Sequence, residues 1–174
     1  MKYWIIGVVV IIVLAAGYWY LHQGSAVTPG SPSFQSATFT IDGKPAKIGQ
    51  GGVAYFGNDV TADLDGDGTP DKAFLITYDG GGSGTFYYAV AALNRPGGYM
   101  GSDGYLLGDR IAPQTTEMSH NPVQKYVVVF NYADRNPGEP MTTQPSLGKS
   151  AYLKIDPATV QWGIVVPNFE GESR

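Results

Sequence analysis

The chain has 174 residues, enough for one domain with a substantial core but not for two. Glycine, proline and tyrosine are frequent (24, 12 and 12 residues) and charged residues make up only 15%, which favours strands and turns over solvent-exposed helices. The formal net charge of −4 argues against nucleic-acid binding, which needs a basic surface. Because the chain contains no cysteine, disulfides and thiolate chemistry are excluded.

The first predicted element is a membrane-spanning helix over residues 3–21, which carry no charged side chain. About 20 apolar residues span the hydrocarbon core of a bilayer as a helix. Trp4 near one end and the aromatic run 18–20 near the other suit the two membrane interfaces. The alternative is a cleaved signal peptide, but its apolar region has about 7–15 residues and ends in small residues. We therefore favour an uncleaved N-terminal anchor over residues 1–21.

The charge before this segment predicts the orientation of the protein. Lys2 is the only charged residue ahead of the apolar run, and the positive-inside tendency keeps it in the cytoplasm. Residues 22–33 are rich in Gly, Ser and Pro and read as a flexible linker. We therefore expect a single-pass protein of the cell membrane whose domain, residues 34–174, lies outside the cytoplasm.

Short apolar or alternating runs separated by turn signals follow the linker, as is typical of strands. The predicted strands cover residues 37–41, 53–56, 72–78, 85–93, 125–132, 151–155 and 160–166. The dipeptide Asp42-Gly43 predicts a turn after the first strand, and 125–132, the most apolar β-branched run, is expected to be a central strand. No segment keeps a helical apolar stripe over three turns, although 112–120 is a candidate for a short helix. Residues 137–145 are expected to form a long irregular loop. The fold class that follows is mainly β: a small antiparallel domain, sandwich- or meander-like, preceded by one transmembrane helix.

The most informative motif is DLDGDGTPD, residues 63–71, which lies between two predicted strands. Its carboxylates fall at the alternating positions of a calcium loop, and Gly68 stands at position 6, where such a loop turns sharply. Calcium prefers six to eight hard oxygen ligands and tolerates irregular geometry, whereas magnesium requires near-octahedral coordination. The predicted Ca²⁺ ligands are the carboxylates of Asp63, Asp65, Asp67 and Asp71 and the backbone carbonyl of Thr69.

Other interpretations of this loop remain open. An EF-hand is excluded, because Phe74 stands where a bidentate Glu would be needed and a strand follows the loop. Four carboxylates in nine residues repel one another, so without a cation they must spread into water as a solvated acidic turn. A catalytic acid pair would need different environments for its two members, and these aspartates look alike. We favour calcium, bound as a structural element rather than as a signal.

Other motifs suggest sites less strongly. Residues 79–85 (DGGGSGT) are expected to form the turn of a hairpin between 72–78 and 85–93. They lack the lysine and the following helix of a phosphate-binding loop, and the surroundings of Ser83 lack the second glycine of a nucleophile elbow. His120 reads as a surface residue rather than as a triad member. Asp109 and Arg110 are expected to pair as part of a turn. Six tyrosines form either a partly buried rim or a sugar- or peptide-binding face: Tyr87, Tyr88, Tyr99, Tyr105, Tyr126 and Tyr132.

Two resemblances rest on these residues. The acidic loop, followed by GGSGTFY, LGDR and a proline-bearing loop over about residues 60–155, is similar to a group of uncharacterised bacterial exported or membrane-anchored proteins. This similarity implies export or membrane anchoring and no particular activity. The acidic loop also resembles the shortened calcium loops of integrin-type FG-GAP repeats, although it occurs only once in this chain.

The function expected from these observations is a non-enzymatic binding or structural module of the cell envelope. Its partners would be the membrane and a protein or glycan at the envelope. The alternative is an envelope hydrolase that uses acidic residues near the loop. A cleft that holds Asp71, Asp109 or His120 beside a second polar group would favour the enzyme.

Overall fold

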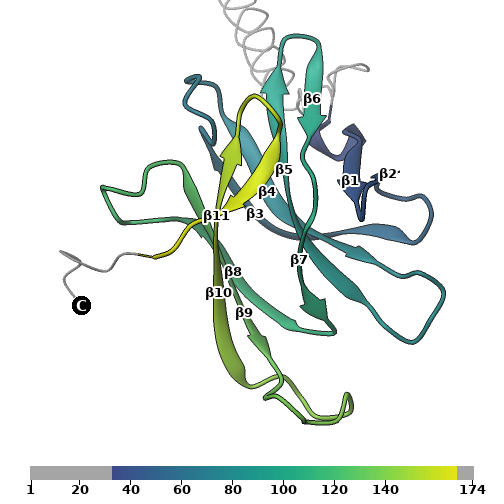
Figure 1. Cartoon of the computed structure of the whole chain (residues 1–174). Coiled ribbons are helices and arrows are strands. Elements are labelled where there is room, and N and C mark those ends of the chain that lie inside the picture. The colour runs from purple at the N-terminus through teal and green to yellow at the C-terminus, as the bar shows by residue number, and fades with distance from the viewer. Residues whose placement is uncertain (1–32, 168–174) are drawn as a thin grey trace, which may run out of the picture. The chain divides into compact units, whose positions relative to one another are not determined.

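The computed structural model describes residues 33–167, which form short strands and one 3₁₀ turn, η1 (Phe34–Ser36). In this part of the chain no α-helix occurs, and the antiparallel β class predicted from the sequence is confirmed (Figure 1). The strands are β1 (Phe39–Ile41), β2 (Lys44–Ala46), β3 (Val53–Ala62), β4 (Asp71–Tyr78), β5 (Phe86–Arg95), β6 (Gly98–Gly101), β7 (Tyr105–Asp109), β8 (Ala112–Met118), β9 (Val127–Asp134), β10 (Leu147–Asp156) and β11 (Gln161–Ile164).

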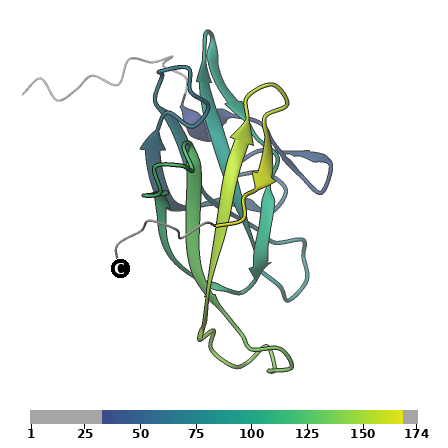
Figure 2. The same ribbon diagram turned by 60° about the vertical axis from the view of Figure 1, so that its left-hand side comes forward.

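These strands form three sheets. The largest has the order β3-β4-β5-β6, with β7 also paired to β5, and the second has the order β11-β10-β9-β8. The hairpin β1-β2 forms the third. Every ladder between the named strands is antiparallel, as expected for strands joined by short turns. The two larger sheets pack against each other around a shared core (Figure 1, Figure 2).

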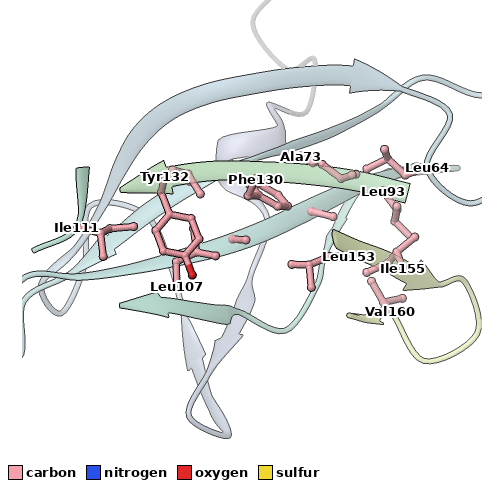
Figure 3. Close-up of a cluster of buried hydrophobic side chains, with 14 residues drawn as sticks. Leu64, Ala73, Leu93, Leu107, Ile111, Phe130, Tyr132, Leu153, Ile155 and Val160 are labelled. Atoms are coloured by element: carbon pink, nitrogen blue, oxygen red, sulfur yellow. The ribbon is translucent and has the colours of Figure 1, made fainter. Parts of the chain in front are cut away.

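Strands β4 and β5 are buried on both faces, which explains their nearly continuous apolar sequences. On one face, Leu75 and Leu93 contribute to the core shared with β9 and β10, whose members are shown in Figure 3. On the other face, Phe74 and Val90 pack against residues of the β1-β2 hairpin, among them the fully buried Phe39. The alternation of side chains along a strand divides these residues between the two cores.

The β1-β2 hairpin turns through a two-residue loop that its sequence predicts. Asp42 and Gly43 both have positive φ, +49° and +74°, as a type I′ turn requires. Beyond this pair, the backbone of Thr40 bonds to the segment after β6: its N–H donates to Ser102 O (3.0 Å), and its carbonyl accepts from Gly104 N (2.7 Å). The hairpin is therefore fixed onto the outer face of the large sheet.

The short helix proposed for residues 112–120 was wrong. Residues 112–118 form strand β8, which pairs with β9 and has no other partner in its own sheet. Thr115 and Thr116 are β-branched and fit an extended backbone better than a helix. Pro113 is tolerated because β8 lies at an edge, where a missing N–H removes no ladder bond from a second neighbour.

Other element predictions agree with the structure. The apolar run 125–132 corresponds to β9, which lies between β8 and β10 in its sheet, as a central strand should. The predicted hairpin of 72–78 with 85–93 is the β4-β5 pair. Residues 137–145 contain no strand. Strands β6 and β7 were not anticipated, because their glycines weaken the strand pattern.

The predicted anchor, residues 1–21, and nearly all of the linker lie outside the described residues, as do residues 168–174. Within 33–167, no helix has the length and apolarity that crossing a membrane requires.

Candidate metal site between β3 and β4

The acidic loop connects β3 to β4 at one end of the large sheet. Ala62 ends β3 and pairs with Asp71, the first residue of β4, so the loop closes a tight strand-to-strand turn. Gly66 and Gly68 have φ of +85° and +84°, values that L-residues with side chains seldom adopt. The glycine spacing of the motif therefore allows the backbone to curl around its own carboxylates.

Three of the five predicted ligands converge. Asp63, Asp65 and Asp71 each place a carboxylate oxygen within 4.8 Å of the corresponding oxygens of the other two. Two oxygens on opposite sides of a calcium ion lie about 4.8 Å apart, because each Ca–O distance is about 2.4 Å. The spacing of the three carboxylates is therefore compatible with one shared cation.

The carboxylates also shape the backbone of the loop. Asp63 accepts hydrogen bonds from the N–H groups of Gly66 (2.6 Å) and Gly68 (3.1 Å). Asp65 accepts one from Asp67 N (3.2 Å), and Asp67 accepts one from Thr69 N (2.7 Å). Such hydrogen bonds, from a backbone N–H to an aspartate a few residues earlier, form the local turns that aspartate favours. The loop is thus held partly by its own acidic groups, whether or not an ion is bound.

Asp67 does not join the other three carboxylates. Its Oδ2 accepts a hydrogen bond from Arg95 Nη1 at 2.7 Å, and its side chain is 39% exposed. The backbone N–H of Thr69 is the largest cause that holds the pKa of Asp67 below its ordinary value, and the Thr69 side chain and the positive charge of Arg95 lower it further. The ligand role of the Thr69 carbonyl stays a prediction.

Arg95 is the residue at this site that sequence reasoning missed. Its guanidinium also pairs with Asp65, so one arginine bridges two carboxylates of the loop. Asp65 and Asp67 in turn raise the pKa of Arg95, with the hydrogen bond to Asp65 as the largest cause. The register of the β4-β5 hairpin explains its position: Lys72 is opposite Ala92, so Arg95 extends past the start of β4 and lies beside the loop.

Asp71 is the buried member of the site. None of its surface is exposed, and its two oxygens accept hydrogen bonds from Leu64 N (3.0 Å) and Asn94 N (2.8 Å). Burial raises the pKa of Asp71. The two N–H groups oppose this effect, whereas the negative charges of Asp65 and Asp67 add to it. Asp71 therefore ties the start of the loop to the end of β5 while it faces the other carboxylates.

The loop also contacts the second sheet. Leu64 is fully buried and belongs to the shared core, where Figure 3 places it at the same end as Leu93. A Cβ added to Gly66 would lie only 3.3 Å from Cζ of Tyr126, in the segment before β9, so the tyrosine ring packs closely on the loop backbone here. Lys154 Nζ lies 5.7 Å from the centre of the same tyrosine ring. The loop is consequently anchored on both sides.

Each of the three residues named for the enzymatic alternative has a structural position within residues 33–167. Asp71 is buried and uses both oxygens on backbone N–H groups. Asp109 pairs with Arg110 (3.0 Å) and accepts from Thr85 N (2.9 Å), as the turn interpretation expected. His120 is exposed after β8. None of the three lines the cleft between the β1-β2 hairpin and the start of β3.

The other candidate residues have structural positions. Residues 79–85 connect β4 to β5, so the hairpin interpretation is confirmed and Ser83 lies exposed in the connection. The six tyrosines do not form one exposed face: Tyr88 and Tyr132 are buried, Tyr126 is 37% exposed, and the other three are half-buried.

Comparison of the chain with protein-family models, with curated proteins and with solved structures finds no match.

Proposed function

We propose that this protein is a membrane-anchored, extracytoplasmic module of the bacterial cell envelope, with a Ca²⁺ ion that stabilises the loop between β3 and β4. The observation that carries the calcium proposal is the convergence of Asp63, Asp65 and Asp71 within 4.8 Å. Oxygen-only donors of this kind suit calcium, whereas zinc would require His or Cys ligands, which this loop lacks.

The charge balance of the loop supports a bound cation. Its four aspartates carry four negative charges when ionised, and Arg95 supplies one positive charge, which leaves 4 − 1 = 3 uncompensated. Arg95 reaches Asp65 and Asp67, whereas no ion pair within residues 33–167 involves Asp63 or Asp71. A divalent cation beside Asp63 and Asp71 would neutralise most of the remaining charge.

The position of the loop favours a stabilising ion over a sensory one. Leu64, inside the loop, is part of the shared core, and Asp71 begins a strand buried on both faces. An ion at this point stabilises the turn between two core strands. Both ends of the loop are held in this way, at Leu64 and at Asp71, so an ion bound between them would stabilise an arrangement that the core already favours. We therefore propose a structural role for calcium.

The envelope location rests on the sequence. The uncharged run 3–21, the linker 22–33 and Lys2 at the N-terminus all favour a single-pass anchor with the domain outside the cytoplasm. A protein or glycan partner at the envelope is part of the same proposal, because a domain held outside the cytoplasm is exposed to such partners.

The calcium proposal is tested by thermal unfolding of the full-length chain in EGTA and in excess calcium. Extracellular sites bind calcium at about 10⁻⁴–10⁻³ M, so a calcium concentration of about ten times the Kd should stabilise the fold by about 1.4 kcal/mol. Asp63→Asn with Asp65→Asn should remove the difference, and Asp79→Asn, outside the loop, should keep it. Equal melting temperatures in EGTA and calcium for the unaltered chain would overturn the site.

The location is tested separately with reporters fused to the C-terminus. Alkaline phosphatase, which is active only outside the cytoplasm, should be active in the fusion and should sediment with membranes. A fusion that is inactive in this assay and recovered in the soluble fraction would contradict the proposed location. Turnover of a substrate panel that is lost in Asp109→Asn would instead favour the hydrolase.

A further inference from the structure

A cleft far from the acidic loop lies between the β1-β2 hairpin and the start of β3 (the hairpin is on the right in Figure 1). Its volume is about 460 Å³, within the range of about 300–1,000 Å³ that is typical of small-molecule sites. Ile41, Ala46 and Val53 provide a buried apolar floor, and Tyr78 supplies an aromatic wall. The cleft is therefore large enough for a single ring-sized ligand.

The backbone around the cleft is held in place. Gly52 lies in the turn just before β3, beside the cleft, and its carbonyl accepts a hydrogen bond from Asp79 N at 2.9 Å. A Cβ at Gly52 would lie 1.9 Å from Asp79 O, so these two backbone segments approach so closely that only glycine fits. On the other side, the bonds of Thr40 to Ser102 and Gly104 fix the hairpin. Preformed walls reduce the ordering cost of binding.

Two lysines give the cleft its charge. Lys44 and Lys47 line it, and within the described part of the chain neither side-chain ammonium group has an ion pair or a hydrogen bond. Asp42 also lines the cleft and accepts a hydrogen bond from Tyr88 OH at 3.2 Å. The formal charge is therefore 2 − 1 = +1 in a chain whose net charge is −4. A cleft with this charge suits a monoanion better than a dianion.

We propose that this cleft binds an acidic sugar, that is, a hydroxylated ring with one carboxylate. The carboxylate would lie near Lys44 and Lys47, and the apolar face of the ring would pack on the floor and against Tyr78. Asp42 and Gln50, which also lines the cleft, offer partners for ring hydroxyls. A free sugar acid and a uronate residue within an acidic polysaccharide share this chemistry.

This site is independent of the proposed calcium site. Strand β3 begins at Val53, in the cleft, and ends at Ala62, next to the acidic loop, so the two sites lie at opposite ends of one strand. Binding of the sugar does not require calcium, and a failure of one proposal leaves the other standing.

The test is a titration of the full-length chain, isotopically labelled for NMR, with glucuronate, glucose and an alginate oligosaccharide. Glucuronate should bind with a Kd of about 1 mM or below and should shift the amide signals of Ala46 and Val53. Glucose, which lacks the carboxylate, should bind at least about tenfold more weakly, in proportion to the lost charge contacts. Tighter binding of the oligosaccharide identifies a polysaccharide as the source, and equal binding identifies the free acid.

Variants separate the cleft from general charge effects. Lys44→Gln with Lys47→Gln should weaken glucuronate binding about tenfold or more, because both positive charges are lost. Lys125→Gln, a lysine before β9 and outside the cleft, should leave it unchanged, and so should EGTA. The proposal is overturned if no ligand shifts Ala46 or Val53, if glucose binds as well as glucuronate, or if Lys125→Gln has the same effect as the double variant.

Discussion

Arg95, at the end of β5, donates a hydrogen bond to Asp67 across 28 positions of sequence, with 2.7 Å between Nη1 and Oδ2. The same guanidinium pairs with Asp65, one of the three convergent carboxylates. The chain therefore supplies a cation of its own to the loop where we propose calcium. Arginine and calcium would compete for the charge of Asp65.

Arg95→Gln should increase the affinity for calcium. Removing a positive charge beside the site lowers the repulsion of the ion, by on the order of threefold to tenfold in affinity for one screened surface charge. In EGTA the variant should melt lower than the unaltered chain, because Asp65 and Asp67 lose their partner. Arg110→Gln, whose partner Asp109 lies outside the loop, is the control. The same calcium-dependent rise in melting temperature in both variants and the unaltered chain would contradict competition.

Asp71→Ala should destabilise the fold even without calcium. The substitution leaves the buried N–H groups of Leu64 and Asn94 without acceptors, and each such loss costs about 1–3 kcal/mol. Removal of a buried charge returns part of this cost, so we expect a net loss of about 2 kcal/mol in urea unfolding with EGTA present. Asp79→Ala is the control, because Asp79 is exposed and accepts from Gly81 N. Equal effects of the two variants would show that Asp71 is not a structural acceptor.

Gly52→Ala should be far more damaging than Gly51→Ala, although the two residues are neighbours with positive φ (+82° and +56°). A Cβ at Gly52 would overlap Asp79 O at 1.9 Å, so the turn must move away from β4, whereas a Cβ at Gly51 meets nothing within 4 Å. We expect a loss of about 3 kcal/mol or more for Gly52→Ala and about 1 kcal/mol for Gly51→Ala. Denaturant unfolding measures both. Similar losses would show that the close approach is absent in solution.

Asp109 should make the fold lose stability in acid. The hydrogen bond from Arg110, with help from Thr85 N, holds the pKa of Asp109 below its ordinary value, so the folded state favours the carboxylate. This contribution is fully present above the unfolded pKa of about 3.9 and is lost as pH falls through the lower folded pKa. Asp109→Asn should therefore reduce the slope of stability between about pH 5 and pH 2, by no more than about 1 kcal/mol for a partly exposed pair.

Asp103→Asn provides the control of opposite sign for this measurement. Burial raises the pKa of Asp103, which also accepts a hydrogen bond from Trp162 N at 2.8 Å. The Asp103 carboxyl binds a proton more tightly in the folded than in the unfolded state. Its contribution to the free energy of unfolding therefore favours the fold in acid and is lost as pH rises through the folded pKa. Its replacement should steepen the loss of stability toward low pH. Urea unfolding across this pH range should show opposite changes in slope for the two variants.

Much of the fold was readable from local patterns. Alternating and apolar runs predicted the β class, the β4-β5 hairpin and the central position of β9, because strand burial has a period that a sequence displays. The Asp42-Gly43 turn was equally local. The segment 112–120 misled us, since its strand character depends on pairing with β9 rather than on its own apolar pattern. Strands β6 and β7 are glycine-bearing and are held mainly by their ladders with β5.

The acidic loop shows where local pattern ends. The spacing of Asp63, Asp65 and Asp71 and the neighbouring glycines predicted their convergence, because a loop of nine residues has few ways to arrange them. Strands distant in sequence decide three other features: Asp67 turns toward Arg95, Asp71 is fully buried, and Tyr126 packs on Gly66. Arg95 and the lysine-lined cleft depend on them as well. Side chains brought together by strand pairing and sheet packing leave no shared spacing in the chain, and so they became visible only when the sheets were assembled.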